Sequence, residues 1–384
     1  MDFEYTDEQN MFRKMAREFC QRYVIPIARE IDREDRFPKE LLKELASLGL
    51  LGIMAPQEYG GLGADRICYC VVVEELAQGS IAASTLVTTQ NSFAEIPILE
   101  WGNEEQKRKY IPRMVKGELF GCLAVTEPNY GSDPAGMETS AVRDGNSWVI
   151  NGSKMYITHG DVADVVTTSA QTARGSRHTG IITFLIERGM PGFRSRPLRG
   201  KLGWHGTAMA ELIYENLRIP DENVLGKVGD GFKVLMSALD DNRVGNAAHS
   251  IGLSLAAIRA CISYAQQRQQ FGKLIGSFQL IQSMIADMIV ETEAARLLTY
   301  KAAALMDKGK REIPETSYCK LYATEVAQRV TCNAIQIHGA AGYLDEYPVE
   351  RLYRDARAIT ILEGTSEIHR LIIGRHALGI SAFV

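Results

Sequence analysis

The segment WVINGSKMYIT, residues 148–158, divides the chain into parts with different residue periodicity. Polar and apolar residues alternate on both sides of Asn151-Gly152, and this period of two is typical of a half-buried strand. An Asn-Gly pair between two such runs is the strongest short-range signal for a β-hairpin. The segment therefore predicts two antiparallel strands that turn at residues 151–152, with a sheet built around them.

Further strands and two helical regions surround this segment. DVVTTSAQ (164–171), GIITFLIER (180–188) and AELIYENLRIP (210–220) extend the sheet. Before it, the sequence is helical, with a capping-box signal at Thr6 and Gln9. After it, long periodic segments around 232–268, 278–308, 314–340 and 365–380 suggest a four-helix bundle. We predict a multidomain α+β fold: an N-terminal helical domain (1–118), a middle β-barrel-like domain (119–228) and a C-terminal four-helix bundle (229–384).

The composition excludes several classes of protein. The 43 basic residues face 47 acidic ones, for a net charge of −4, so there is no electrostatic footprint for nucleic acid. The acidic N-terminus MDFEYTDEQN lacks the apolar region of a secretory signal, and no apolar stretch has the length of a membrane helix. The seven cysteines are scattered, as expected for reduced thiols. We expect a cytoplasmic protein that neither inserts into membranes nor binds nucleic acid.

The common motifs for nucleotides, metals and serine nucleophiles are missing. The sequence contains neither G-x-G-x-x-G nor G-x-x-x-x-G-K-[ST], and the glycine-rich pieces GLGAD and GKVGDGF have the spacing of turns. The seven histidines form no pair with metal-ligand spacing, so we predict no metal site. There is also no G-x-S-x-G nucleophile elbow.

Two stretches of the middle region carry candidate ligand-binding groups. In LAVTEPNYGSDPAGMETSA (123–141), Gly131 and Ser132 allow close backbone approach and offer donors to an anion such as pyrophosphate. An ordinary strand-to-loop connection explains the same composition. In KMYIT, the period of two places Tyr156 and Thr158 on one face of a strand, a pattern that also fits core and rim residues.

The stretch ILEGTSEIHR (361–370) places a carboxylate, Glu363, after an apolar run and just before a helix. Burial there would raise its pKa, and a carboxylate tuned in this way can take a proton from carbon. The alternative is that Glu363 stabilises the helix N-terminus through the helix dipole.

Six motifs in order together resemble the acyl-CoA dehydrogenase family: VTEPNYGSD, NGSKMYIT, RQQFGK, QIHGAAGY, YPVERLYRDAR and ILEGTSEIHR. The resemblance extends from about residue 5 to the C-terminus. It implies an FAD enzyme that removes two hydrogens from the α and β carbons of an acyl-CoA thioester. It also implies a homotetramer, a dimer of dimers, that passes electrons to an electron-transferring flavoprotein.

The resemblance assigns roles to individual residues. Glu363 matches the catalytic base, with Gly364 against the substrate, and Ser132, Asp240, Asn242 and Arg243 match substrate and CoA contacts. Flavin-contacting positions correspond to Leu123, Val125, Thr126, Gly131, Ser132, Tyr156, Ile157, Thr158, Thr365 and Glu367. Positions that hold the FAD pyrophosphate and adenosine, across a subunit boundary, correspond to Arg268, Phe271, Gln279, Gln336, Gly339 and Ala340.

Some branches of the family carry the base on the helix that here reads DDNRVGNAA. The position before Arg243 is then Glu, whereas this chain has Asn242, which cannot act as a base. This difference favours Glu363.

The substrate signal is mixed. ETSAV, IERGMPGF, GKLG and GISAF look similar to glutaryl-CoA dehydrogenases, in which an arginine on the helix at 82–99 grips the distal carboxylate. Our alignment puts Ser84 there, and no Arg or Lys lies between Arg66 and Lys107. A buried distal carboxylate would be unpaired, so we predict a neutral short, branched or cyclic acyl group, with cyclohexane-ring carboxyl-CoA esters among the candidates.

Three alternatives stay open: a glutaryl-CoA-like enzyme for dicarboxylyl-CoA, a flavin oxidase or monooxygenase on the same fold, and a flavin-bearing nucleic-acid-binding relative. Monooxygenase relatives generally lack the base. The nucleic-acid-binding relative would need a basic domain or tail, and the C-terminal HALGISAFV is apolar.

Overall fold

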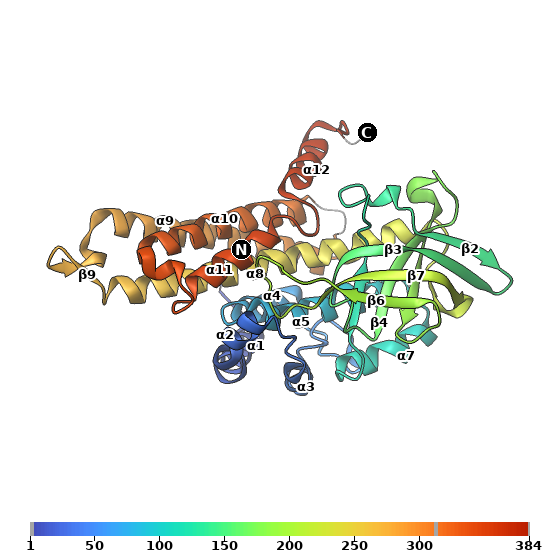
Figure 1. Ribbon diagram of the computed structural model, residues 1–384, viewed down its shortest axis with the longest axis horizontal. Helices are drawn as coiled ribbons and strands as arrows, with labels where there is room; N and C mark the ends of the chain where they lie inside the picture. Colours follow the sequence, from blue (N-terminus) through green and yellow to red (C-terminus); the bar gives the residue numbers. More distant parts are fainter. Residues whose placement is uncertain (1–3, 311–313, 383–384) are drawn as a thin grey trace.

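The computed structural model describes residues 4–310 and 314–382, which form helices, a sheet and a second set of helices in chain order (Figure 1). The N-terminal helices lie beneath the sheet and the long C-terminal helices. They are α1 (Asp7–Phe19), α2 (Ile25–Glu34), α3 (Glu40–Ser47), α4 (Arg66–Ala77), α5 (Ile81–Thr88), α6 (Ile96–Trp101) and α7 (Glu104–Val115). The predicted capping box begins α1, where Thr6 Oγ1 accepts from the Gln9 N–H and the Gln9 side chain accepts from the Thr6 N–H. A π-helical segment, Thr89–Glu95, joins α5 to α6.

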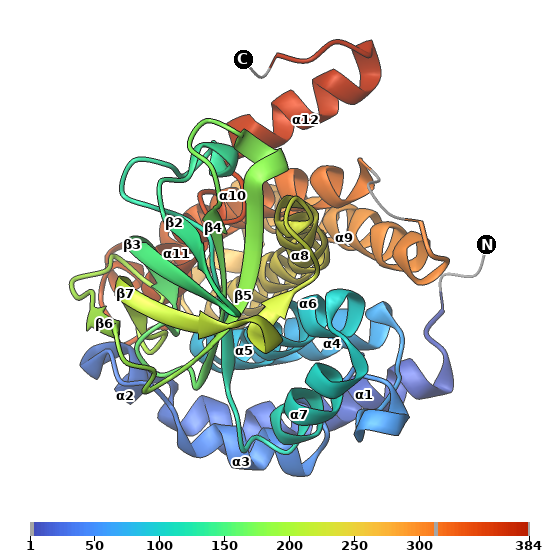
Figure 2. The same cartoon turned by 90° about the vertical axis from the view of Figure 1, so that its right-hand side faces the viewer.

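The middle strands curl into one sheet with the order β6-β7-β3-β2-β4-β5-β8, and β1 pairs with β4 (Figure 2). Their bounds are β1 (Gly121–Ala124), β2 (Ser140–Asp144), β3 (Ser147–Thr158), β4 (Val165–Gln171), β5 (Ile181–Glu187), β6 (Phe193–Pro197), β7 (Met209–Pro220) and β8 (Val224–Leu225). The inward side chains of these strands form their own apolar cluster. The predicted multidomain α+β class is confirmed.

The predicted hairpin at Asn151-Gly152 is wrong. Residues 147–158 form one continuous strand, β3, which has a register irregularity at this pair opposite β7. The β2–β3 hairpin instead turns at Gly145 and Asn146. Gly152 is needed for close approach, because a Cβ at that position would lie 2.6 Å from Thr139 Oγ1. The Asn-Gly pair therefore marks a β-bulge here, where glycine relieves a clash.

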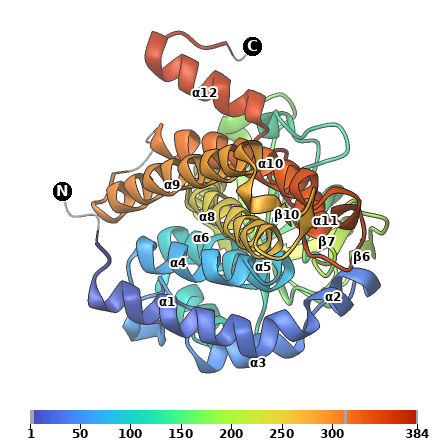
Figure 3. The same cartoon turned by 90° about the vertical axis from the view of Figure 1, so that its left-hand side faces the viewer.

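The C-terminal helices are α8 (Gly231–Ala265), α9 (Gln279–Asp307), α10 (Glu315–His338), α11 (Val349–Ile359) and α12 (Ser366–Leu378). The predicted fourth bundle helix at 365–380 is misplaced. Figure 3 shows α8, α9, α10 and α11 packed together, while α12 projects away from them. The apolar face of α11, which carries Val349, Leu352, Ala356 and Ile359, is fully buried against α8 and α10. Most of α12 is exposed, so it cannot replace that face.

A buried ion pair fixes the loop between β1 and β2. Lys154 Nζ, on β3, donates to Glu127 Oε1 at 2.8 Å and to the Val125 carbonyl at 3.2 Å. The backbone N–H groups of Glu138 and Thr139 donate to the same carboxylate. Burial raises the pKa of Glu127, but Lys154 and these donors outweigh it and hold the pKa below its usual value. The two ends of the 125–139 loop are therefore tied to β3.

We expect Glu127→Gln to destabilise the protein by about 3–5 kcal/mol, because it leaves the Lys154 ammonium buried without a counter-charge. Equilibrium urea unfolding measures this loss. Asp133→Asn is the matched control, because Asp133 lies in the same loop but forms an exposed ion pair, with Arg177. Its loss should lower the stability by less than about 1 kcal/mol. Equal effects of the two substitutions would contradict the role of the buried pair.

In the part of the chain that the structure describes, none of the helices combines the length and hydropathy needed to cross a membrane.

Candidate active site

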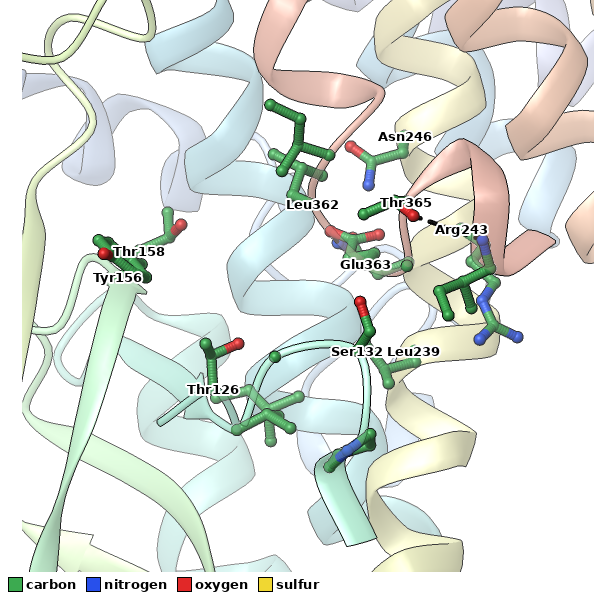
Figure 4. Close-up of a pocket in the computed structure, with 18 of the residues that line it drawn as sticks. Thr126, Ser132, Tyr156, Thr158, Leu239, Arg243, Asn246, Leu362, Glu363 and Thr365 are labelled. Atoms are coloured by element: carbon green, nitrogen blue, oxygen red, sulfur yellow. Dashed lines mark hydrogen bonds between the residues drawn. The ribbon is translucent and has the colours of Figure 1, made fainter. Parts of the chain in front are cut away.

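A cavity of about 1230 Å³ lies where the β-domain meets α8 and the segment that precedes α12 (Figure 4). Its walls come from the end of β3, the loop after β1, the helix α5 with its π-helical extension, and residues 361–365. Small-ligand sites usually have about 300–1000 Å³. This cavity is large enough for two ligands side by side.

Glu363 lies in the turn between α11 and α12 and has a positive φ of 57°. This left-handed conformation costs a non-glycine residue about 1–3 kcal/mol, so its surroundings must hold it. Gly364, with φ of 95°, continues the turn, and its carbonyl accepts from the buried Lys320 Nζ at 2.7 Å. Thr365 then caps α12 by accepting from the Ile368 N–H. The helix cap is thus Thr365, and the Glu363 side chain is free to face the cavity.

The Glu363 carboxylate is enclosed by protein and only partly hydrogen-bonded. Its Oε1 accepts from Asn242 Nδ2 on α8, whereas Oε2 has no partner within the described residues. Burial raises the pKa of Glu363 above its usual value, against an opposing effect of the nearby Lys320 ammonium. The arrangement yields a carboxylate that gains a proton more readily than one in water and has one buried oxygen without a direct hydrogen bond.

The opposite wall belongs to the β-domain. Tyr156 and Thr158 lie next to each other at the end of β3, as the sequence predicted, and Thr126 and Ser132 come from the loop after β1 (Figure 4). A second register irregularity in β3 and a φ of 60° at Tyr156 turn its ring outward, with 62% of the residue exposed. An aromatic ring left bare on a cavity wall is suited to cover a flat ligand.

The cavity brings together most of the predicted site residues. Besides Glu363, the lining includes Leu123, Val125, Thr126, Gly131, Ser132, Tyr156, Ile157, Thr158, Asp240, Asn242, Arg243, Gly364 and Thr365. Glu367 is outside this lining, on the exposed surface of α12.

Six other predicted residues lie at the far end of the bundle: Arg268, Phe271, Gln279, Gln336, Gly339 and Ala340. Asn246 lines the cavity, and α8 continues from it to Ala265. With a rise of about 1.5 Å per residue, the end of α8 is about 30 Å from Asn246. His338 stacks on Tyr264 with 4.4 Å between ring centroids, so the ends of α8 and α10 meet there. These six residues are exposed, and a single chain does not bring them to Glu363.

Sequence reasoning missed three polar residues of this region: Lys320 and Asn246, which interact with Glu363, and His249, which lines the same cavity. On α10, Lys320 lies on the same helical face as buried apolar residues such as Ala323. A lysine at a position where the helical spacing predicts an apolar residue could have indicated a functional role from the sequence. Asn246 and His249 follow Asn242 at intervals of four and three residues, which places them on one face of α8.

The position aligned with the carboxylate-binding arginine does not face the cavity. Ser84 is completely buried, and its hydroxyl donates to the Val73 carbonyl on α4 at 3.2 Å. Thr85, Thr88 and Thr89 line the cavity from this helix instead. The helix from which an arginine would reach a distal carboxylate thus offers only hydroxyl groups.

Two helical domains and a β-domain meet around one cavity, which holds a buried carboxylate opposite an exposed aromatic ring, and this is the arrangement of a multidomain protein with a ligand site between its domains. Family comparison identifies it: the N-terminal, middle and C-terminal domain models of acyl-CoA dehydrogenases match residues 6–118, 122–217 and 229–378. The chain belongs to the acyl-CoA dehydrogenase family, whose members are FAD-dependent oxidoreductases that act on CH–CH bonds.

Individual relatives cover nearly the whole chain. A short-chain-specific acyl-CoA dehydrogenase of Clostridium acetobutylicum is 42% identical over 373 residues, which are 97% of this chain and 98% of the relative. The butyryl-CoA dehydrogenase structure from Megasphaera elsdenii superposes with a TM-score of 0.96 at 39% identity, covering 98% and 100% of the two chains. A glutaryl-CoA dehydrogenase solved with glutaryl-CoA gives a TM-score of 0.96 at 39% identity, covering 99% and 97%.

Proposed function

We propose that this protein oxidises a short, branched or cyclic acyl-CoA with a neutral acyl group to the 2-enoyl-CoA, with Glu363 as the base. The observation that carries the proposal is the Glu363 carboxylate itself: it is desolvated, its Oε2 makes no direct hydrogen bond, and it lines a cavity large enough for both a flavin and an acyl chain. The α-proton of a thioester is too weakly acidic for an ordinary carboxylate in water. A raised pKa of Glu363 makes it a stronger base, which reduces the difference in pKa between the base and the α-carbon.

The β-domain wall fits a flavin. The bare ring of Tyr156 would cover one face of a flat ring system, and Thr158, Val125 and Thr126 would lie along its edge. Around Gly131, a Cβ would meet only Thr126 Cγ2, at 4.0 Å, so the loop backbone is open to close approach by a ligand. FAD held there supplies an acceptor for the hydride that leaves the β-carbon.

The residues of the chain would prepare the substrate for loss of its α-proton. Asn242 fixes one oxygen of Glu363, which leaves the other to receive the proton. No described residue accepts a hydrogen bond from the Glu363 backbone N–H, so this donor is available to the thioester oxygen. A donor at that oxygen stabilises the charge that develops as the α-proton leaves.

The far end of the bundle supports assembly with further copies. Arg268, Gln279 and Gln336 would bind the pyrophosphate and adenosine of a flavin held mainly by a neighbouring chain. Phe271 is 93% exposed, and Leu280 and Tyr343 nearby are also bare, which is unfavourable unless another surface covers them. We therefore propose a homotetramer, arranged as a dimer of dimers.

The proposed substrate is neutral because the α5 wall of the cavity carries hydroxyl groups and no cation. A dicarboxylyl-CoA would leave its distal carboxylate without a partner on this wall, at a cost of several kcal/mol. Similarity to short-chain and butyryl-CoA dehydrogenases supports a small acyl group.

The test is anaerobic mixing of the purified FAD-loaded protein with a panel of acyl-CoAs, followed through bleaching of the flavin. We expect bleaching by neutral short or cyclic acyl-CoAs. The reduced enzyme should then react slowly with oxygen and quickly with an electron-transferring flavoprotein. Fast reoxidation by oxygen would instead identify an oxidase, and a protein that cannot be loaded with FAD would refute the proposal.

A further inference from the structure

His369 is one of two buried residues of α12, a helix that the structure describes in full, and the other is Ser366. The remaining residues of α12 are at least partly exposed, and the helix projects away from the bundle (Figure 3). Ser366 Oγ donates to Glu325 Oε1 on α10 at 2.6 Å, and His369 is 0% exposed. The buried contacts of this helix therefore lie at its start, directly after Glu363.

The ring of His369 lies against the turn that presents Glu363. A Cβ placed on Gly364 would be 3.1 Å from His369 Nε2 and 3.6 Å from Cε1, so this edge of the ring faces the glycine. The backbone of both Glu363 and Gly364 is also within hydrogen-bonding reach of the ring. One imidazole thus contacts the two consecutive residues with left-handed φ values, 57° and 95°.

The His369 ring acts on this turn as a neutral donor. Burial lowers the pKa of His369 to about 3, the nearby Arg243 and Lys320 cations lower it further, and hydrogen bonding to the Glu363 and Gly364 backbone opposes them. At neutral pH the ring is therefore uncharged and has one N–H group, which can donate to a carbonyl of the turn. A buried imidazole without such a partner would be unfavourable.

Lys320 contacts the same turn but carries a charge. Its Nζ donates to the Gly364 carbonyl at 2.7 Å, and its ammonium group favours the anionic form of Glu363. A neutral His369 ring has no charge with which to change the pKa of Glu363. Loss of His369 and loss of Lys320 should therefore have different effects on the pH dependence of the reaction.

Resting on the proposed role of Glu363 as the base, we propose that His369 is a positioning residue, which holds the turn at 363–364 and so directs the Glu363 carboxylate at the α-carbon of the substrate. The left-handed conformation is unfavourable for a glutamate and persists only while its surroundings hold it. Without the ring the turn can relax, and a displacement of about 1 Å at a reacting group can slow a reaction about a hundredfold.

Two substitutions of His369 test this role through the rate constant of flavin bleaching. His369→Leu removes the donor, and we expect the rate constant to fall about 10- to 100-fold in a single anaerobic turnover with an acyl-CoA that bleaches the wild-type protein. FAD content, the dissociation constant of the acyl-CoA and the pH midpoint of the rate should keep their wild-type values. His369→Gln should restore most of the rate, because its amide nitrogen can lie near the position of Nε2.

Thr299→Val is the matched control. Thr299 is also completely buried, donates to the Ala295 carbonyl at 2.8 Å on α9 and does not line the cavity. This substitution also removes a buried donor to a carbonyl, and it should leave the rate constant unchanged. A simple loss of stability lowers the amplitude of bleaching, because less protein is folded and loaded with FAD, but it does not lower the rate constant.

The outcomes separate this inference from the proposed function. A wild-type rate constant in His369→Leu refutes the positioning role and leaves Glu363 as the base, and a shifted pH midpoint refutes the role of a neutral ring. Equal rate constants for His369→Leu and His369→Gln refute the role of the donor. If His369→Leu does not fold, His369→Asn replaces it, since its shorter amide reaches only to about Nδ1 and should give the same loss of rate.

If no acyl-CoA bleaches the wild-type flavin, the proposed function fails, and crystal structures of the variants still decide the role of His369. Residues 363–364 should leave the left-handed conformation in His369→Leu, or in His369→Asn, and keep it in His369→Gln. A turn that is unchanged in all variants refutes the inference.

Discussion

Glu363→Gln should slow flavin reduction by an acyl-CoA about a thousandfold or more, while the protein still binds FAD and substrate. Glutamine has nearly the same shape, and its amide oxygen can accept the hydrogen bond from Asn242 that Oε1 now accepts. What is lost is the second carboxylate oxygen, Oε2, which makes no direct hydrogen bond and would take the α-proton. Anaerobic stopped-flow mixing measures the rate of bleaching, and the spectral change on binding measures affinity separately.

Glu215→Gln is the control, because Glu215 is a carboxylate on β7 whose side chain is 61% exposed and which does not line the cavity. It should leave the rate unchanged. In the wild-type protein, kcat/KM should rise with pH through a pKa above the ordinary value of 4.5, because the base must be deprotonated and burial favours its protonated form. Near-normal turnover of Glu363→Gln would mean that another residue takes the proton.

Lys320→Met should lower activity at neutral pH by about tenfold or more and shift the acid limb of kcat/KM to higher pH. The Lys320 ammonium is fully buried near Glu363 and favours its anionic form. Its removal takes away the largest effect that opposes the desolvation of Glu363, so the pKa of the base rises further and less of it is ionised at neutral pH. Activity should recover as the pH is raised.

A purely structural role of Lys320 would give a different result. Lys320 also donates to the Gly364 carbonyl, and loss of this bond should cost about 1–3 kcal/mol of stability at any pH. If the pH profile of Lys320→Met has the wild-type midpoint and only its amplitude falls, the electrostatic role is refuted. Lys301→Met, which removes an exposed lysine paired with Glu315, should change neither the midpoint nor the amplitude.

The order of helices and strands could be predicted from local patterns, and the errors have physical causes. Asn151-Gly152 has the composition of a turn, but the glycine serves to avoid Thr139, which directly precedes β2, and a local pattern does not contain this contact. Helix α11 was missed although Val349, Leu352 and Ala356 follow helical spacing, since its charged residues and short length hid the buried face. The helix that completes the bundle is the one whose apolar face is buried against the other helices, and this depends on tertiary packing.

The sequence by itself determined the family, the sequence of helical and β regions, and Glu363 as the candidate base. All of these depend on residue patterns within short segments or on motifs that occur in a fixed order. Only the tertiary structure placed Asn242 and Lys320 around Glu363, although Asn242 is 121 residues away in the chain. Periodicity indicates which side of a helix is buried but not what it meets. The surroundings of the base are therefore set by the packing of α8 and α10 against the turn before α12.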